Sequence, residues 1–175
     1  MTINDIVTKI RGRKLSDIYL AGFIDKDDLM CKFQPMLSCV YFEFNENIIE
    51  FELVDGLDYM MRLSFTDTVR HLFEIEEGDQ ASFCSVREFY LLDPDSDNKL
   101  KEMRLWSARE YGDEIRCLAA RIDLLNGQNI FIDPTYHFGI RIGSQHQELI
   151  WKEHWPKAKD SEEIVLELFD SPTGR

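Results

Sequence analysis

The chain has 175 residues, about the size of one domain, and a domain of that length buries roughly 70% of its unfolded surface. Hydrophobic residues make up 44% of the chain, which is too apolar for a disordered protein. Asp and Glu outnumber Lys and Arg by 33 to 20, so the net charge is −13. Proteins bind nucleic acid and anionic lipid through Lys and Arg, so neither is an expected partner.

Several features favour a reduced, cytoplasmic protein. The first five residues lack the basic and apolar regions of a signal peptide, and no apolar stretch approaches the ~20 residues that a membrane helix needs. The four cysteines, Cys31, Cys39, Cys84 and Cys117, contain no C-x-x-C pair. Neither a cysteine zinc site nor a disulfide scaffold is therefore expected. Cys39 and Cys117 lie in apolar runs and are expected to be buried and inert.

The first predicted element is an amphipathic helix. Four apolar residues recur at helical spacing, namely Ile3, Ile6, Val7 and Ile10. Thr2 or Asn4 can cap the start of this helix, and Gly12 can end it. Its apolar stripe is narrow, so the helix is expected to lie on a larger body.

From Leu15 the apolar period changes to two, which predicts strands. Residues 17–24 form the first candidate, and residues 40–44 and 49–53 form a hairpin around Asn45-Glu46-Asn47. Cys39 and Tyr41 occupy the second face of residues 40–44, so that strand is predicted to be covered on both faces. A turn at Asp55-Gly56 leads into a strand over residues 61–65, and residues 66–73 are compatible with one helical turn or a loop.

The second half has the same pattern. Residues 83–92, 103–108 and 138–142 are strand candidates, and Asn126-Gly127 is the strongest hairpin signal, predicted to pair residues 115–124 with residues 129–132. Residues 170–175 are expected to be a frayed tail. The sequence thus predicts one α+β domain over residues 1–175. It contains one curved antiparallel sheet of about eight strands, packed by the N-terminal helix and at most one further short helix.

Metal and cofactor sites are not expected. Asp93, Asp95 and Asp97 match the first half of an EF-hand loop, but Asn98 replaces the glycine and Arg104 the final carboxylate, so an acidic turn is predicted. The four histidines, at positions 71, 137, 146 and 154, match no ligand spacing. No catalytic signature is present, which favours a protein that is not an enzyme.

The most distinctive segment runs from residue 133 to residue 143. It gathers four candidate ligand-binding residues in a strand–turn–strand region, namely Asp133, Tyr136, His137 and Arg141. A nucleophile pair of Cys84 or Cys117 with His137 is conceivable, although nothing in the sequence brings them together. Alternatively, the segment is structural, with Asp133-Pro134 ending a strand and Gly139 permitting a bulge.

The function predicted from charge is a non-catalytic module that binds a basic protein. Ten candidate partner-binding carboxylates lie in three segments: Asp25, Asp27 and Asp28; Glu74, Glu76, Glu77 and Asp79; and Asp93, Asp95 and Asp97. Immunity proteins that neutralise nuclease toxins share this size and charge, a likeness in bulk properties alone. The alternatives are an enzyme or small-ligand binder with a pocket near His137 and Arg141, and a structural subunit whose acidic surface only keeps it in solution. The oligomeric state stays open.

Overall fold

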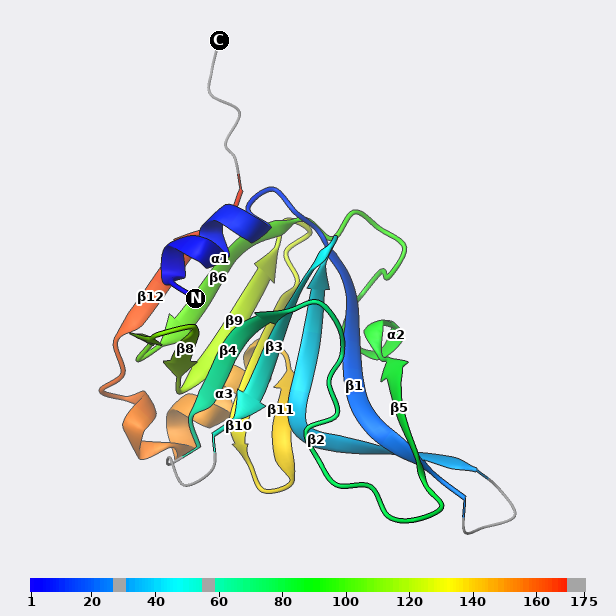
Figure 1. Ribbon diagram of the computed structural model, residues 1–175. Coiled ribbons are helices and arrows are strands. Elements are labelled where there is room, and N and C mark those ends of the chain that lie inside the picture. Colours follow the sequence, from blue (N-terminus) through cyan, green and yellow to red (C-terminus); the bar gives the residue numbers. More distant parts are fainter. Residues whose placement is uncertain (27–30, 55–58, 170–175) are drawn as a thin grey trace.

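The computed structural model describes residues 1–26, 31–54 and 59–169. Within these residues the strands form two antiparallel sheets (Figure 1). The larger sheet comprises β1 (Leu15–Asp25), β2 (Lys32–Phe44), β3 (Asn47–Leu53), β4 (Met61–Thr66), β5 (Gln80–Ser85), β7 (Arg109–Tyr111) and β8 (Glu114–Cys117). The smaller one comprises β6 (Leu100–Trp106), β9 (Ala119–Leu124), β10 (Asn129–Tyr136), β11 (Gly139–Gly143) and β12 (Glu163–Glu167). The helices are α1 (Ile3–Ile10), α2 (Arg87–Tyr90) and α3 (Gln145–His154), followed by the 3-10 turn η1 (Pro156–Ala158).

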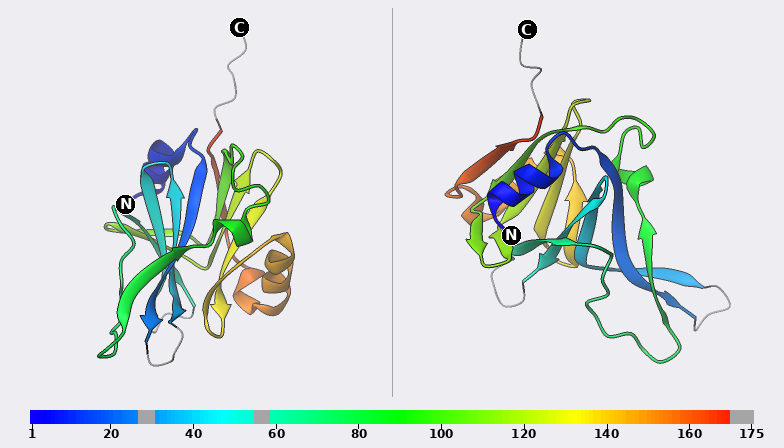
Figure 2. Two further views of the ribbon diagram at one scale, coloured as in Figure 1. Left: turned by 90° about the vertical axis from the view of Figure 1, so that its right-hand side faces the viewer. Right: turned by 45° about the horizontal axis from the view of Figure 1, so that its top comes forward.

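The strand order is β5-β1-β2-β3-β4-β8-β7 in the larger sheet and β11-β10-β9-β6-β12 in the smaller one. The predicted α+β class with antiparallel strands is confirmed, but the strands make two facing layers where one sheet of about eight strands was expected (Figure 2). The division falls inside the predicted strand 115–124. Its first residues belong to β8 and its last to β9, and the backbone N–H of Leu118 between them donates to the carbonyl of Trp106 (2.8 Å).

The main core lies between the two sheets. The alternating residues of β2, namely Val40, Phe42 and Phe44, are fully buried there, and Val40 faces Phe51 across the predicted hairpin. The Asn126-Gly127 hairpin is also confirmed, because β9 and β10 pair from Asn129 with Asp123 to Ile132 with Ala120. Both hairpins formed where apolar alternation flanks a short turn.

The outer face of the larger sheet is covered as well. Cys39 and Tyr41 are buried there under Val69 and Phe73, which confirms that β2 is covered on both faces. The segment after β4 lies across the sheet without forming a helix, and the Tyr41 hydroxyl donates to the backbone carbonyl of Arg70 (2.8 Å). Of the ambiguous residues 66–73, Thr66 ends β4 and residues 67–73 are a covering loop.

Helix α1 closes one open side of the sandwich (Figure 1). Thr2 caps it as predicted, in a reciprocal capping box with Asp5, and Ile6 and Ile10 are fully buried in the core. Gly12 follows the helix with φ +68°, and its N–H donates to the Leu168 carbonyl just beyond β12 (2.8 Å). The N-terminal ammonium of Met1 donates to the carbonyl of Gly112 in the turn after β7. The helix thus connects the two sheets.

Helix α3 covers the outer face of the smaller sheet, as the left view of Figure 2 shows. Trp151 packs there edge-to-face on Trp106, with ring centroids 5.6 Å apart, and against the tilted ring of Phe131, with centroids 5.5 Å apart. Beside these rings, Glu148 accepts from Arg121 (2.7 Å) and from Lys152 (2.5 Å). Within the described ranges no helix is long and apolar enough to cross a membrane.

Candidate functional site

Two of the three acidic segments lie together. Ile24 at the end of β1 pairs with Gln80 at the start of β5, which places Asp25 beside the loop of residues 74–79 (Figure 1). Asp27 and Asp28 lie outside the described residues. The loop with Asp93, Asp95 and Asp97 follows α2 at the opposite end of β5. The eight described carboxylates of the predicted set therefore do not form one continuous surface, because they lie near opposite ends of β5.

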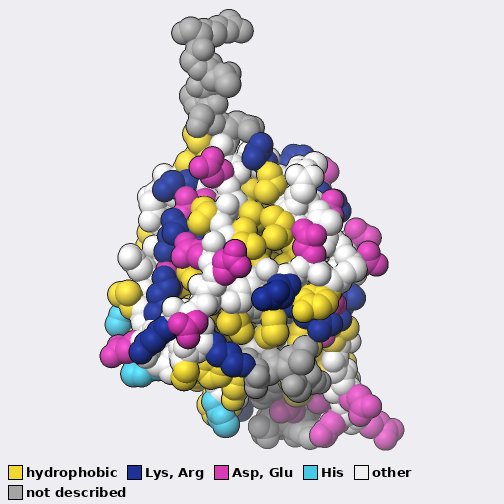
Figure 3. Space-filling model, turned by 90° about the vertical axis from the view of Figure 1, so that its left-hand side faces the viewer, with side chains coloured by type: hydrophobic (Ala, Val, Ile, Leu, Met, Phe, Trp, Pro, Cys, Tyr) yellow, Lys and Arg dark blue, Asp and Glu magenta, His cyan; other side chains and the backbone are white. Residues whose placement is uncertain are grey.

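The two ends differ in how far their charge is compensated. In the loop after α2, Asp97 pairs with Lys99 (2.8 Å) and Asp95 with Arg87 (3.5 Å). By contrast, four carboxylates of the other loop have no side-chain hydrogen bond or ion pair with any described residue, namely Glu74, Glu76, Glu77 and Asp79. On the side that carries α1 and β12, acidic and basic side chains are interspersed over most of the surface (Figure 3). The loop of residues 74–79 is thus a concentrated negative charge that no described side chain compensates.

Apolar side chains are exposed along the edge between the two acidic loops. The ring of Phe83 on β5 is 52% exposed and stacks edge-to-face on Tyr19, with centroids 5.7 Å apart. Phe89 in α2 is 84% exposed and Leu92 just after it 80%. Large apolar side chains left in water beside charged loops are typical of protein-binding surfaces. We call β5, α2 and the loop of residues 74–79 the β5–α2 edge.

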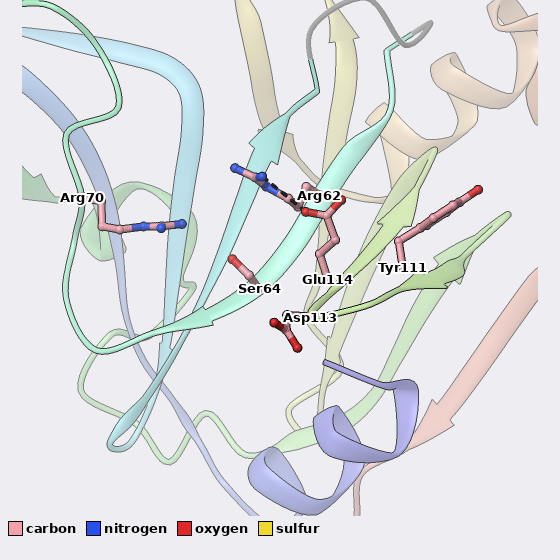
Figure 4. A pocket seen from close by; sticks show the side chains of 6 residues that line it. All are labelled: Arg62, Ser64, Arg70, Tyr111, Asp113 and Glu114. Atoms are coloured by element: carbon pink, nitrogen blue, oxygen red, sulfur yellow. Dashed lines mark hydrogen bonds and ion pairs between the residues drawn. The ribbon is translucent and has the colours of Figure 1, made fainter.

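A charged groove of about 240 Å³ lies on the outer face of the larger sheet (Figure 4). Arg62 on β4 reaches Glu114 on β8 (3.3 Å) and also bonds to Glu52, while Arg70 enters from the covering loop. Arg70 holds the fully buried carboxylate of Glu50 through two bonds, one of them Nε–Oε2 at 2.9 Å. These bonds raise the pKa of both arginines. Both cations are therefore engaged: Arg62 joins neighbouring strands, and Arg70 holds the covering loop to the sheet.

The four predicted ligand-binding residues do lie together. A hollow of about 290 Å³ between the β10–β11 hairpin and α3 is lined by all of them, Asp133, Tyr136, His137 and Arg141. Cross-strand pairing of Asp133 with Arg141 explains this, because opposite residues project from the same face of a sheet. The other walls come from α3 and the residue after it, mainly Gln147, Trp151, His154 and Trp155, which sequence reasoning did not include.

Asp133 itself is buried and holds the hairpin to α3. Its Oδ1 accepts from the backbone N–H (2.8 Å) and the hydroxyl (2.6 Å) of Thr135, and its Oδ2 accepts from the Gln147 amide (2.7 Å). The carboxylate also lies near the first turn of α3, where the helix dipole favours negative charge. Arg141 lies over the Tyr136 ring, 5.4 Å from its centroid.

The structure does not bring Cys117 to His137 as a nucleophile pair. Cys117 is fully buried in the core, whereas His137 is exposed in the β10–β11 turn. Burial raises the pKa of the thiols of Cys84 and Cys117, and it raises that of Cys39 to about 12, which suppresses the reactive thiolate. His71 is bonded to the backbone carbonyl of Ser82 (2.9 Å).

Metal-ligand geometry is likewise absent from the described part of the chain, where no three His, Cys, Asp or Glu side chains converge. The acidic turn after α2 is stabilised internally, because Ser96 and Asn98 side chains donate to the carbonyl of Asp93 (2.9 and 3.0 Å). The predicted acidic turn is thus present and held by its own side chains.

The fold and the sites together describe a two-layer antiparallel α+β protein with an acidic, partly apolar edge at β5 and α2 and a small hollow beside α3. Comparison with protein-family models, with curated proteins and with solved structures finds no match to the chain. The edge and the hollow are thus the two surfaces that indicate what the protein binds.

Proposed function

We propose that the chain is a non-catalytic module that binds a basic protein, and that it does so at the β5–α2 edge. The observation that carries the proposal is the loop of residues 74–79. Its four carboxylates lack partners among the described residues, and the loop leads directly into β5, which carries the exposed ring of Phe83. An immunity-type protein that neutralises a basic toxin would be one instance of this class.

The physical basis is the cost of concentrated like charge. Four carboxylates within six residues repel one another, and a partner that brings Lys or Arg to them relieves that repulsion. Long-range attraction also accelerates association, and salt screens it over about 8 Å at physiological strength. Exposed Phe83 and Phe89 then supply apolar area, and aromatic side chains are enriched at the centres of interfaces.

The test compares two charge variants of equal net charge. The first neutralises the loop with Glu74→Gln, Glu76→Gln, Glu77→Gln and Asp79→Asn. The control neutralises four other exposed carboxylates that also lack side-chain partners among the described residues, with Glu46→Gln, Glu153→Gln, Asp160→Asn and Glu162→Gln. Both sets lie on the surface, so neither is expected to disturb the fold.

A partner is first captured from native lysate and identified, and its association with each variant is then followed by stopped flow. We expect a partner of net positive charge whose association rate falls at least tenfold with the loop variant and little with the control. Raising salt should slow association and leave dissociation almost unchanged. An acidic partner, equal effects of the two variants, or direct binding of DNA or RNA at physiological salt would contradict the proposal.

A further inference from the structure

The hollow between the β10–β11 hairpin and α3 carries an inference that is independent of the proposed function. It lies on the outer face of the smaller sheet, whereas the acidic β5–α2 edge belongs to the larger one. Its volume of about 290 Å³ is at the lower end of the range found for small-molecule sites. The residues that line the hollow determine which class of small molecule it can bind.

The carboxylate of Asp133, a hydrogen-bond acceptor in the wall of the hollow, already has hydrogen-bond partners. Both oxygens of Asp133 accept hydrogen bonds, from Thr135 and from Gln147. These three bonds also draw the carboxylate into the wall, where it is only 2% exposed. A ligand that enters the hollow therefore meets chiefly the remaining polar groups.

Those remaining groups are donors. Arg141, His137 and His154 line the hollow, and none of them makes a hydrogen bond or ion pair with a described residue. Trp151 and Trp155 also line it, and the buried indole N–H of each has no hydrogen-bond partner among the described residues. A buried donor left unpaired costs roughly 1–3 kcal/mol, so acceptor atoms that reach these groups would gain from pairing them. A group of hydrogen-bond donors without partners among the described residues is unusual in a chain with a net charge of −13.

The remaining wall is aromatic and aliphatic. The rings of Tyr136 and Trp155 and the side chain of Ile150 contribute apolar surface, and Tyr59 packs edge-to-face on Trp155 with centroids 5.1 Å apart. Small-ligand sites typically combine such apolar walls with a few polar groups that fix orientation. We propose that this hollow binds a small aromatic carboxylate, with the carboxylate at Arg141 and the ring against the aromatic wall.

The experiment follows the indole N–H signals by nitrogen-15 NMR during titration of the intact chain. The chain has three tryptophans, and Trp106 does not line the hollow, so its signal is an internal control. The probes are benzoate, inorganic phosphate as an anion without an aromatic body, and benzylamine as the matching cation. We expect benzoate to shift the Trp151 and Trp155 signals saturably, phosphate to bind more weakly, and benzylamine to leave them unchanged.

The variant Arg141→Gln removes the cation and should weaken benzoate binding about tenfold or more, the loss of one charge-assisted bond. The matched control is Arg109→Gln, because Arg109 is an exposed arginine on β7 without a partner among the described residues. Both substitutions lie on the surface, and unchanged spectra of the free variants establish that they fold. Tighter binding of benzylamine than of benzoate, phosphate binding as tightly as benzoate, an unaffected Arg141→Gln variant, or no saturable shift at millimolar benzoate would each overturn the assignment.

Discussion

Replacing Arg70 by methionine tests how the covering loop is held to the larger sheet. The guanidinium of Arg70 holds the carboxylate of Glu50 through two hydrogen bonds, and the Glu50 side chain is 0% exposed. Arg70→Met keeps an apolar stem of similar length and leaves that carboxylate buried without a counter-charge. The free energy of unfolding should fall, because the charge cannot return to water without moving the loop.

The magnitude follows from the burial of the two partners. Removing one partner of a buried ion pair typically costs about 3–5 kcal/mol. Arg70 is itself 42% exposed, so water can reach part of the space that its side chain leaves. We therefore expect a loss of about 2–3 kcal/mol, equivalent to a fall in Tm of roughly 5–10 °C for a chain of this size.

Urea unfolding followed by circular dichroism measures the change. The control is Arg109→Met, which removes an arginine without described partners and should cost less than about 0.5 kcal/mol. The double variant Glu50→Leu with Arg70→Met removes both charges and should be more stable than Arg70→Met alone. A loss below about 1 kcal/mol for Arg70→Met, or a double variant less stable than the single one, would refute this account of the pair.

Three further outcomes are expected. Burial alone would raise the pKa of Glu148, but bonds from Lys152 and Arg121 lower it below its ordinary value of 4.5. The contribution of the Glu148 carboxylate to stability is therefore complete above about pH 4.5 and is lost as pH falls through its lower pKa in the folded state. The urea midpoint of Glu148→Gln should accordingly fall less steeply on acidification than that of the unmodified protein. A thiol reagent should label exposed Cys31 first and Cys117 only on unfolding, as mass spectrometry of labelled peptides would show. Gly139→Ala should lower Tm more than Gly127→Ala: both glycines have positive φ, but the added Cβ would meet the Leu37 carbonyl oxygen at 2.4 Å only at position 139.

Local patterns predicted most strands because the hairpins depend on neighbours in sequence. The sequence also contained a sign of the division into two sheets, because the apolar core-facing positions change from odd to even within residues 115–124. Ile115 and Cys117 face the core at odd positions, whereas Ala120 and Ile122 do so at even ones. Such a shift indicates that the strand is interrupted at Leu118. The prediction of a single strand over residues 115–124 did not take this shift into account.

Helix α3 was missed because its sequence is polar and its buried face depends on tertiary contacts. Trp151 packs on rings from β6 and β10, which no local pattern reveals. One signal was present, since Ser144 followed three residues later by Gln147 matches a capping box. The hollow was predicted only in part for the same reason. Its strand residues are neighbours in the hairpin, but Trp151 and Trp155 reach it only once α3 has docked.

The passage of the chain from β8 to β9 couples the two layers mechanically. Leu118 alone separates the strands, and its N–H is bonded to Trp106 in the smaller sheet. The layers therefore cannot slide or part here without breaking strand pairing on both sides, unlike sheets that are joined by a long loop. We therefore expect local opening away from this junction, at the ends of β5 and at the β10–β11 turn. The β8–β9 junction therefore ties the two sheets together, and both proposed binding regions lie away from it.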